Sequence, residues 1–168
     1  MSEDKAERRC GPCSQCCKVF DVPELQSPAG EWCRHVKRGG GCGAYETRPQ
    51  VCRGFLCQWV LDPSIPHRFR PDLTKVVLSA AGDEARPSLV ANCDPGNPLA
   101  WRREPIYGLL KHQARSRWGR LVVVAKAGPR TWLVLPDEDR DLGDIPPRQT
   151  IEVDQHPDGR WDVRIVDL

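Results

Sequence analysis

Cysteine placement is the feature that most constrains this chain. Eight of its nine cysteines lie between Cys10 and Cys57, and the ninth, Cys93, stands alone. An odd total and the adjacent pair Cys16 and Cys17 disfavour complete disulfide pairing, which would suit an extracellular protein. Reduced thiols gathered in one segment are typically metal ligands. The sequence therefore predicts an intracellular protein whose first third folds around metal.

The remaining composition favours a cytoplasmic protein. Residues 1–9 alternate acidic and basic side chains without an apolar stretch, so we expect a disordered tail there and no signal peptide. The longest apolar run, Leu121 to Ala125, is long enough for a strand and too short for a membrane span. A formal net charge of +2, with both signs interspersed, gives little attraction to membranes or nucleic acid.

The cysteine segment predicts a site for a soft metal. Thiolates in this number select zinc, iron–sulfur clusters or copper(I) and exclude calcium and magnesium. Short x2 spacings let neighbouring sulfurs reach one centre, and the longer gaps bring ligands from separate loops. His35 is an additional candidate ligand. The predicted metal ligands are Cys10, Cys13, Cys16, Cys17, Cys33, Cys42, Cys52 and Cys57.

Spacing alone does not divide these ligands between sites. If residues 12–20 form a helix, Cys10, Cys13 and Cys17 share one face, and Cys16 points about 100° away from Cys17. The two adjacent cysteines would then serve different centres. Eight thiolates allow two four-thiolate sites, or one iron–sulfur cluster together with a zinc ion.

The residues around the cysteines suit an anionic centre. Glycines 39–41 and 43 permit positive φ and leave N–H groups available to sulfur. Cations in the same segment would offset the negative charge of bound thiolates. Aromatic side chains there would shield the centre from water. The cations are Arg34, Lys37, Arg38, Arg48 and Arg53, and the aromatics are Trp32, Tyr45, Phe55 and Trp59.

Prolines 63, 66 and 71 mark a boundary, because each fixes the backbone away from helix. We therefore predict a cysteine-cluster metal-binding module at 10–62 and an α+β domain at 63–168. The domain is expected to combine strands at 74–79 and 88–91, a helix from Pro105 to about Trp118 with Gly119 after it, and hairpins at 121–135 and 150–166. This describes a small irregular metal-stabilised module followed by a mostly antiparallel sheet with one main helix.

The cysteine segment resembles the zinc- or iron-chelating cysteine-cluster family of the YkgJ type, also called CxxCxxCC proteins. The resemblance covers Cys10 to Trp59 and includes the eight cysteines, Trp32-Cys33-x-His35, Gly41-Cys42, Tyr45-x2-Arg48-Pro49-x2-Cys52-Arg53 and Cys57-x-Trp59. It implies metal chelation through these cysteines. One similar protein, flagellin lysine-N-methylase, transfers methyl groups from S-adenosylmethionine.

Together these features predict a metal-binding protein with a structural, redox or iron-handling role, whose partners are metal ions and a further protein. One alternative is a protein-modifying enzyme of the methyltransferase or redox type, although the four histidines are scattered and catalytic residues are not identifiable. A second alternative is a nucleic-acid-binding module with Trp101 or Trp118 as a stacking platform. Its basic residues would be Arg102, Arg103, Lys111, Arg115, Arg117 and Arg120.

Overall fold

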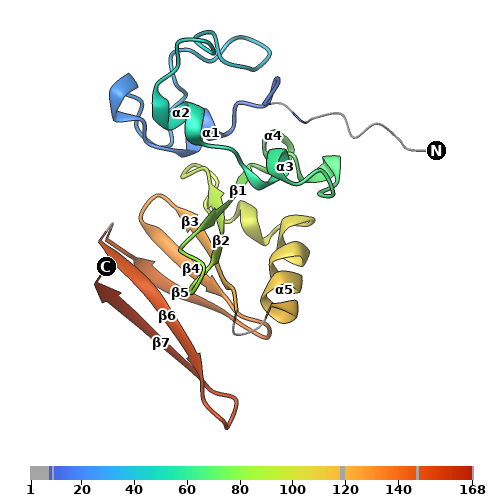
Figure 1. The fold of residues 1–168 in the computed structure, drawn as a ribbon, viewed down its shortest axis with the longest axis vertical. Helices are drawn as coiled ribbons and strands as arrows, with labels where there is room; N and C mark the ends of the chain where they lie inside the picture. Colours follow the sequence, from blue (N-terminus) through green and yellow to red (C-terminus); the bar gives the residue numbers. More distant parts are fainter. Residues whose placement is uncertain (1–7, 9, 118–119, 147, 168) are drawn as a thin grey trace, which may run out of the picture.

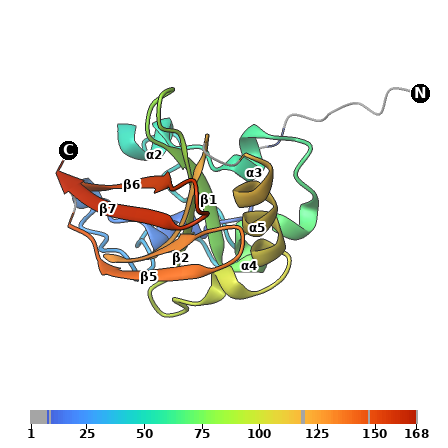
Figure 2. The same ribbon diagram turned by 90° about the horizontal axis from the view of Figure 1, so that it is seen from below.

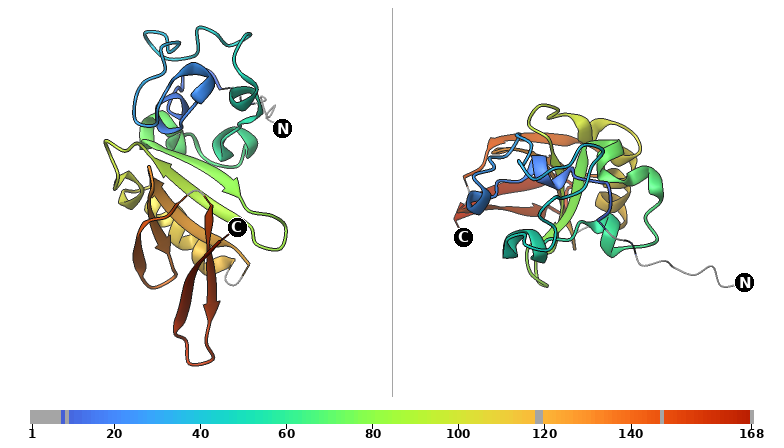
Figure 3. Two further views of the ribbon diagram at one scale, coloured as in Figure 1. Left: turned by 90° about the vertical axis from the view of Figure 1, so that its left-hand side faces the viewer. Right: turned by 90° about the horizontal axis from the view of Figure 1, so that it is seen from above.

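The computed structural model describes residues 8, 10–117, 120–146 and 148–167 (Figure 1). The expected tail at 1–9 therefore lies outside the described residues, apart from Arg8. The cysteine segment occupies one end of the molecule, and the C-terminal hairpin occupies the other (Figures 1 and 3).

The first part of the chain forms only single turns of helix. Prolines begin several of them, because the fixed φ of proline suits a first helical turn, and the short spacing of prolines and glycines prevents longer helices. The turns are α1 (Cys16–Val19), η1 (Pro23–Leu25), α2 (Gln50–Gly54), α3 (Gln58–Leu61), η2 (His67–Phe69) and α4 (Pro71–Thr74). The expectation of an irregular first part is confirmed.

A five-stranded sheet follows, in the order β1-β2-β3-β4-β5. Every pair is antiparallel except β2 with β3, which are parallel. The connection between those two strands contains η3 (Ala100–Arg102) and the main helix α5 (Ile106–Ser116), because parallel neighbours need a crossover. The predicted α+β class, with a mostly antiparallel sheet and one main helix, is confirmed. The strands are β1 (Val76–Ala81), β2 (Ser88–Cys93), β3 (Val122–Ala127), β4 (Arg130–Val134) and β5 (Asp139–Asp144).

The two faces of the sheet are covered by different elements. Alternate side chains such as Val123 and Ala125 face α5, where Leu110 is fully buried. Their neighbours Val122 and Val124 face a separate antiparallel hairpin of β6 (Gln149–Gln155) and β7 (Trp161–Asp167). Figure 2 shows α5 and the hairpin on opposite sides of the sheet. The domain is therefore three-layered.

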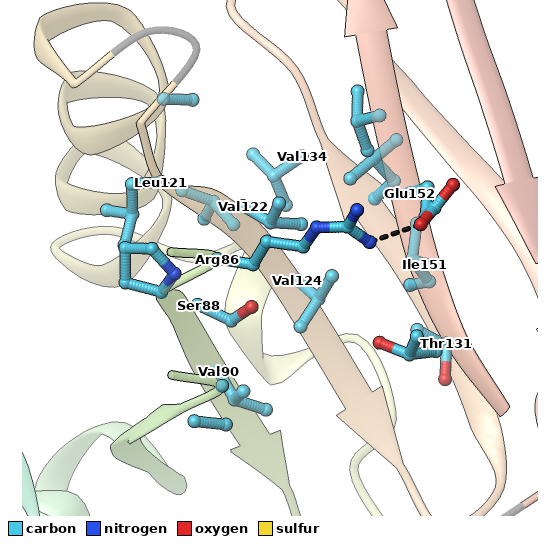
Figure 4. A pocket seen from close by; sticks show the side chains of 18 of the residues that line it. Arg86, Ser88, Val90, Leu121, Val122, Val124, Thr131, Val134, Ile151 and Glu152 are labelled. Carbon is cyan, nitrogen blue, oxygen red and sulfur yellow. Dashed lines mark hydrogen bonds and ion pairs between the residues drawn. The ribbon is translucent and has the colours of Figure 1, made fainter. Parts of the chain in front are cut away.

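A cavity of about 680 Å³ lies between the sheet and the hairpin. Its walls combine apolar and polar side chains, and Val90, Val124 and Ile151 are among the apolar residues that line it (Figure 4). Arg86 spans the opening and pairs with Glu152 of β6. This arrangement fixes the hairpin against the sheet by apolar contact and one ion pair.

The structure differs from the expected elements at four places. Strand β1 covers Val76–Ala81 instead of 74–79, because Thr74 belongs to α4. Strand β5 was not expected, because its sequence DRDLGD has neither β-branched residues nor an apolar alternation. Strand β2 continues through Cys93, because Cys93 pairs with Val76 of β1, and the Asn92 side-chain amide donates to the Val77 carbonyl (3.0 Å). Helix α5 ends at Ser116, and the expected end at Trp118 and Gly119 lies outside the described residues.

Residues on both sides of the predicted boundary at 62/63 contact the sheet domain. Trp59, Ile65 and Phe69 pack against the cluster formed by β1, β3 and α5. An ion pair joins the Lys18 ammonium to the Asp94 carboxylate at 2.5 Å. The cysteine segment is thus connected to the sheet through the packing of turns α3 and α4.

We predict that Leu110→Ala lowers the free energy of unfolding of the sheet domain by about 2–5 kcal/mol, because it leaves a cavity between α5 and the sheet. Leu99→Ala is the matched control, since Leu99 is 48% exposed, and its cost is expected to stay within about 0.5 kcal/mol. Urea denaturation followed by tryptophan fluorescence measures both. Equal losses in the two variants would contradict the proposed core.

Candidate metal centre

The segment 10–57, which the structure describes throughout, is organised by backbone hydrogen bonds. The Cys33 N–H donates to the Cys17 carbonyl (3.0 Å), and the Gly30 N–H donates to the Lys18 carbonyl (2.7 Å). Val36 and Cys42 form an antiparallel bridge. These bonds fold the loops after α1 back onto it, so that cysteines distant in sequence become neighbours.

Three sulfurs meet around α1. The Cys16 side chain is hydrogen-bonded with those of Cys10 and Cys17. The bond with Cys16 lowers the pKa of the Cys10 thiol to about 7, against an opposing effect of burial, and the positive charge of Arg48 contributes to the lowering. The pKa of Cys16 is raised, since its proton is shared with these neighbours and its side chain is desolvated. Cys10 is therefore partly ionised near neutral pH.

Cys13 and Cys57 lie against backbone N–H donors. Burial raises the pKa of Cys13 to about 11, opposed by hydrogen bonds from the backbone of Gln15 and Asp72. Burial also raises the pKa of Cys57, opposed by backbone hydrogen bonds from Val60 and Trp59. Backbone N–H groups directed at sulfur stabilise the thiolate form, which is the form that binds metal.

Cys52 on α2 lies within reach of the charges of other thiols in the segment. Burial raises the pKa of its thiol. The negative charges of Cys17, Cys33 and Cys42 raise that pKa further. An edge-to-face contact between Phe20 and Phe55, with ring centroids 4.8 Å apart, holds the chain after α2 against the end of α1.

The donor set suits a soft metal, although the side chains do not yet converge on one. All nine cysteines are free thiols. As the side chains lie, however, no group of three Cys, His, Asp or Glu residues within the described ranges could hold a metal ion. This includes every group that contains His35, the additional candidate ligand. The buried amide nitrogen of Gln15, beside Cys16, has no hydrogen-bond partner among the described residues. This orphaned donor and the thiol chemistry fit an anionic sulfur-ligated centre.

The glycine loop holds chain segments together rather than directing these N–H groups at sulfur. The N–H groups of Gly40, Gly41 and Gly43 donate to oxygen: the Lys37 carbonyl, the Ser14 hydroxyl and the His35 carbonyl, at 3.0, 2.7 and 2.7 Å. The expected donation to sulfur is therefore absent at these three positions. The donors to sulfur come instead from Gln15, Trp59, Val60 and Asp72.

The expected aromatic cover is incomplete. Trp32 and Tyr45 are 54% and 43% exposed, so they shield little. Phe55 contacts Phe20, and Trp59 packs against the sheet domain. Among the expected cations, Arg48 stacks on Tyr45, 3.5 Å from the ring centroid, and acts on Cys10. Arg53 donates to the Arg48 and Glu46 carbonyls, which fixes the turn carrying Cys52.

Cys93 is separate from these thiols. It is 1% exposed, belongs to the sheet core, and its sulfur lies 3.8 Å from the Ala91 carbonyl. Burial raises its pKa to about 12. It therefore behaves as a small apolar core residue.

The features expected of a nucleic-acid platform are partly absent. Trp101 is fully buried, so it offers no stacking surface, and Trp118 lies outside the described residues. Lys111 is buried and paired with Asp139 at 2.8 Å.

The chain matches no protein-family model, no curated protein and no solved structure. None of the helices in the described ranges is long and apolar enough to cross a bilayer.

We predict that Gly40→Ala destabilises the cysteine segment more than Gly39→Ala. Both glycines have positive φ (97° and 86°), so each substitution incurs similar backbone strain of about 1–2 kcal/mol. A Cβ at Gly40 would lie 1.9 Å from the Pro12 carbonyl oxygen, whereas one at Gly39 meets nothing within 4 Å. The clash adds about 1–3 kcal/mol. Thermal unfolding of the two variants tests this, and equal melting temperatures would show that the Pro12 contact is unimportant.

Proposed function

We propose that this chain is a metal-binding protein that holds an iron–sulfur centre, zinc or both through the eight cysteines of the segment 10–57. The observation that supports the proposal most is the gathering of these free thiols from α1, α2 and the loops around them. Partly buried thiols that lie close together repel one another when ionised, and a bound cation removes that repulsion.

The chain's own residues would hold the thiolates in place and stabilise their charge. The backbone of Asp72 and Val60 donates to sulfur, and Arg48 supplies positive charge beside Cys10. Arg70 makes two hydrogen bonds to Asp72, at 2.6 and 2.7 Å, which fixes the turn beside Cys13. When bound, an iron–sulfur centre would supply electron transfer or iron storage, and zinc would supply structural support.

Iron is the metal we favour. A single structural zinc uses four ligands, and eight thiolates supply twice that number. The orphaned Gln15 donor and the N–H groups around Cys13 and Cys57 suit the sulfide-rich charge of a cluster. Zinc binds the same thiolates, so it would replace iron in protein made in air.

Metal analysis tests the proposal directly. Protein purified without oxygen is expected to be coloured and to contain iron and acid-labile sulfide, with zinc replacing them after aerobic expression. Colourless protein with near-stoichiometric zinc and no sulfide would reject the iron–sulfur assignment and retain metal binding. Protein without bound metal under both conditions, even after reconstitution, would reject the function.

We also predict that metal removal unfolds the segment 10–57 and spares the sheet domain. The segment buries only the apolar side chains Val19, Val22 and Cys33, which cannot offset its chain entropy. After strong chelation, amide hydrogen exchange should become fast in peptides from 10–57, while β1, β3 and β4 stay protected. Unchanged protection in the cysteine segment would show that metal is not its structural support.

A further inference from the structure

The cavity between the sheet and the hairpin of β6 and β7 has the features of a small-molecule binding site. Its volume of about 680 Å³ lies within the range of ligand pockets, about 300–1,000 Å³. We propose that it binds a small amphipathic carboxylate, whose carboxylate group pairs with Arg86 and whose apolar chain lies along β3. This proposal goes beyond metal binding, because residues 10–57 do not line the cavity.

One wall of the cavity is apolar and runs along β3. Val122 and Val124 lie on the side of β3 that faces the hairpin, and Val90 of β2 is the partner of Val124 in the parallel pairing. Ile151 of β6 belongs to the same cluster and lies across the cavity from them (Figure 4). Val122 and Ile151 are only half-buried. An apolar chain in the cavity would cover them and release water from apolar surface, which favours binding.

Arg86 gives one end of the cavity a positive charge. Its side chain is 67% exposed and extends past Val122 to Glu152 of β6, with which it pairs (Figure 4). The loop between β1 and β2 holds the Arg86 backbone in place, because the Asp83 carboxylate accepts from the N–H groups of Ala85 (3.0 Å) and Arg86 (2.8 Å). The guanidinium therefore lies at the opening, where it can reach a ligand carboxylate.

The carboxylates of β6 that line the cavity have cationic partners. Glu152 pairs with Arg86, and it also lies 3.4 Å from the Arg164 guanidinium. Asp154 pairs with Arg164 at 2.6 Å. When a ligand carboxylate takes Arg86 from Glu152, Glu152 keeps its contact with Arg164. Binding therefore leaves neither carboxylate of the hairpin without a positive neighbour.

Two cations that line the cavity have no such partner. The side chains of Arg120 and Lys126 form no ion pair within the part of the chain that the structure describes. Arg120 lies two residues before Val122, the partner of Ser88, so it lies toward the Arg86 end. Lys126 follows Val122 by about 13 Å along the strand, at the opposite end of the apolar wall. The unpaired charge is positive, which favours an anionic ligand.

Calorimetric titration of the full chain with decanoate tests the proposal. Decanoate is expected to bind. Decanol, which has the chain without the charge, and acetate, which has the charge without the chain, should each bind at least about tenfold more weakly. Decyltrimethylammonium, which has the chain with the opposite charge, should not bind. A failure of decanoate to bind, or equal affinities for decanoate and decyltrimethylammonium, would overturn the proposal.

Two variants that break the same ion pair separate recognition from support of the hairpin. Arg86→Gln should weaken decanoate binding about tenfold, because the ligand loses its cationic partner. Glu152→Gln should strengthen it about two- to fivefold, because the competing carboxylate is removed. Arg130→Gln is the control and should change nothing, since Arg130 is exposed, pairs with Asp141 and does not line the cavity. Equal weakening by Arg86→Gln and Glu152→Gln would show that the pair only fastens the hairpin, which would overturn the proposal.

A variant that fills the cavity locates the ligand. Val122→Phe places a larger side chain at a half-buried position of the apolar wall, so it should weaken decanoate binding at least about tenfold. Its thermal unfolding transition shows whether the fold is retained. Unchanged decanoate affinity in the folded variant would place the ligand elsewhere and overturn the proposal. The comparison of Arg86→Gln with Glu152→Gln decides without this variant, because both side chains lie at the opening of the cavity.

Discussion

The scarcity of buried apolar side chains in the segment 10–57 governs the rest of the structure. A chain segment of this length must offset a large conformational entropy, and only Val19, Val22 and Cys33 are buried apolar residues there. The sheet domain, by contrast, buries Trp101, Leu110, Leu133 and a row of valines. The cysteine segment therefore depends on backbone hydrogen bonds, on its contacts with the sheet domain and, in our proposal, on metal.

The ion pair between Lys18 and Asp94 connects the cysteine segment to the sheet domain beside the adjacent pair Cys16 and Cys17. Lys18 follows Cys17 directly, and Asp94 follows the last residue of β2. The side chains are 23% and 9% exposed, so removing one partner would leave a charge partly desolvated. The pair thus gives the turn that carries Cys16 and Cys17 a fixed position on the sheet.

Periodicity predicted the sheet domain well, since both hairpins and α5 have strong local patterns. Strand β5 could not be predicted, because it forms through pairing with β4 and a bulge near Thr131, not through its own composition. The burial of Trp101 also depends on distant residues: its ring meets Trp132 of β4 at 5.9 Å between centroids. The hydrophobic pattern of one sequence segment does not show which distant residues that segment will contact.

In the candidate site, too, local features could be predicted from the sequence and contacts between distant residues could not. The thiols were identifiable from their spacing. A helix over residues 12–20 would have placed Cys10, Cys13 and Cys17 on one face, but α1 is only Cys16–Val19, so Cys10 and Cys13 lie outside it. The Asp72 donor to Cys13 was not identifiable, because the two residues are distant in sequence, whereas the Val60 donor to Cys57 lies within the first turn of α3. The glycines near Cys42, which looked suited to that role, bond to oxygen instead.

The parallel pairing of β2 with β3 has a consequence for how the chain is made. Strand β2 reaches its parallel partner β3 only after α5 and Val122 have left the ribosome, whereas the eight thiols of the segment 10–57 emerge much earlier. Synthesis at about 5–20 residues per second leaves several seconds between the two events. During that interval the segment 10–57 lacks the completed core of β1, β3 and α5 against which Trp59 later packs.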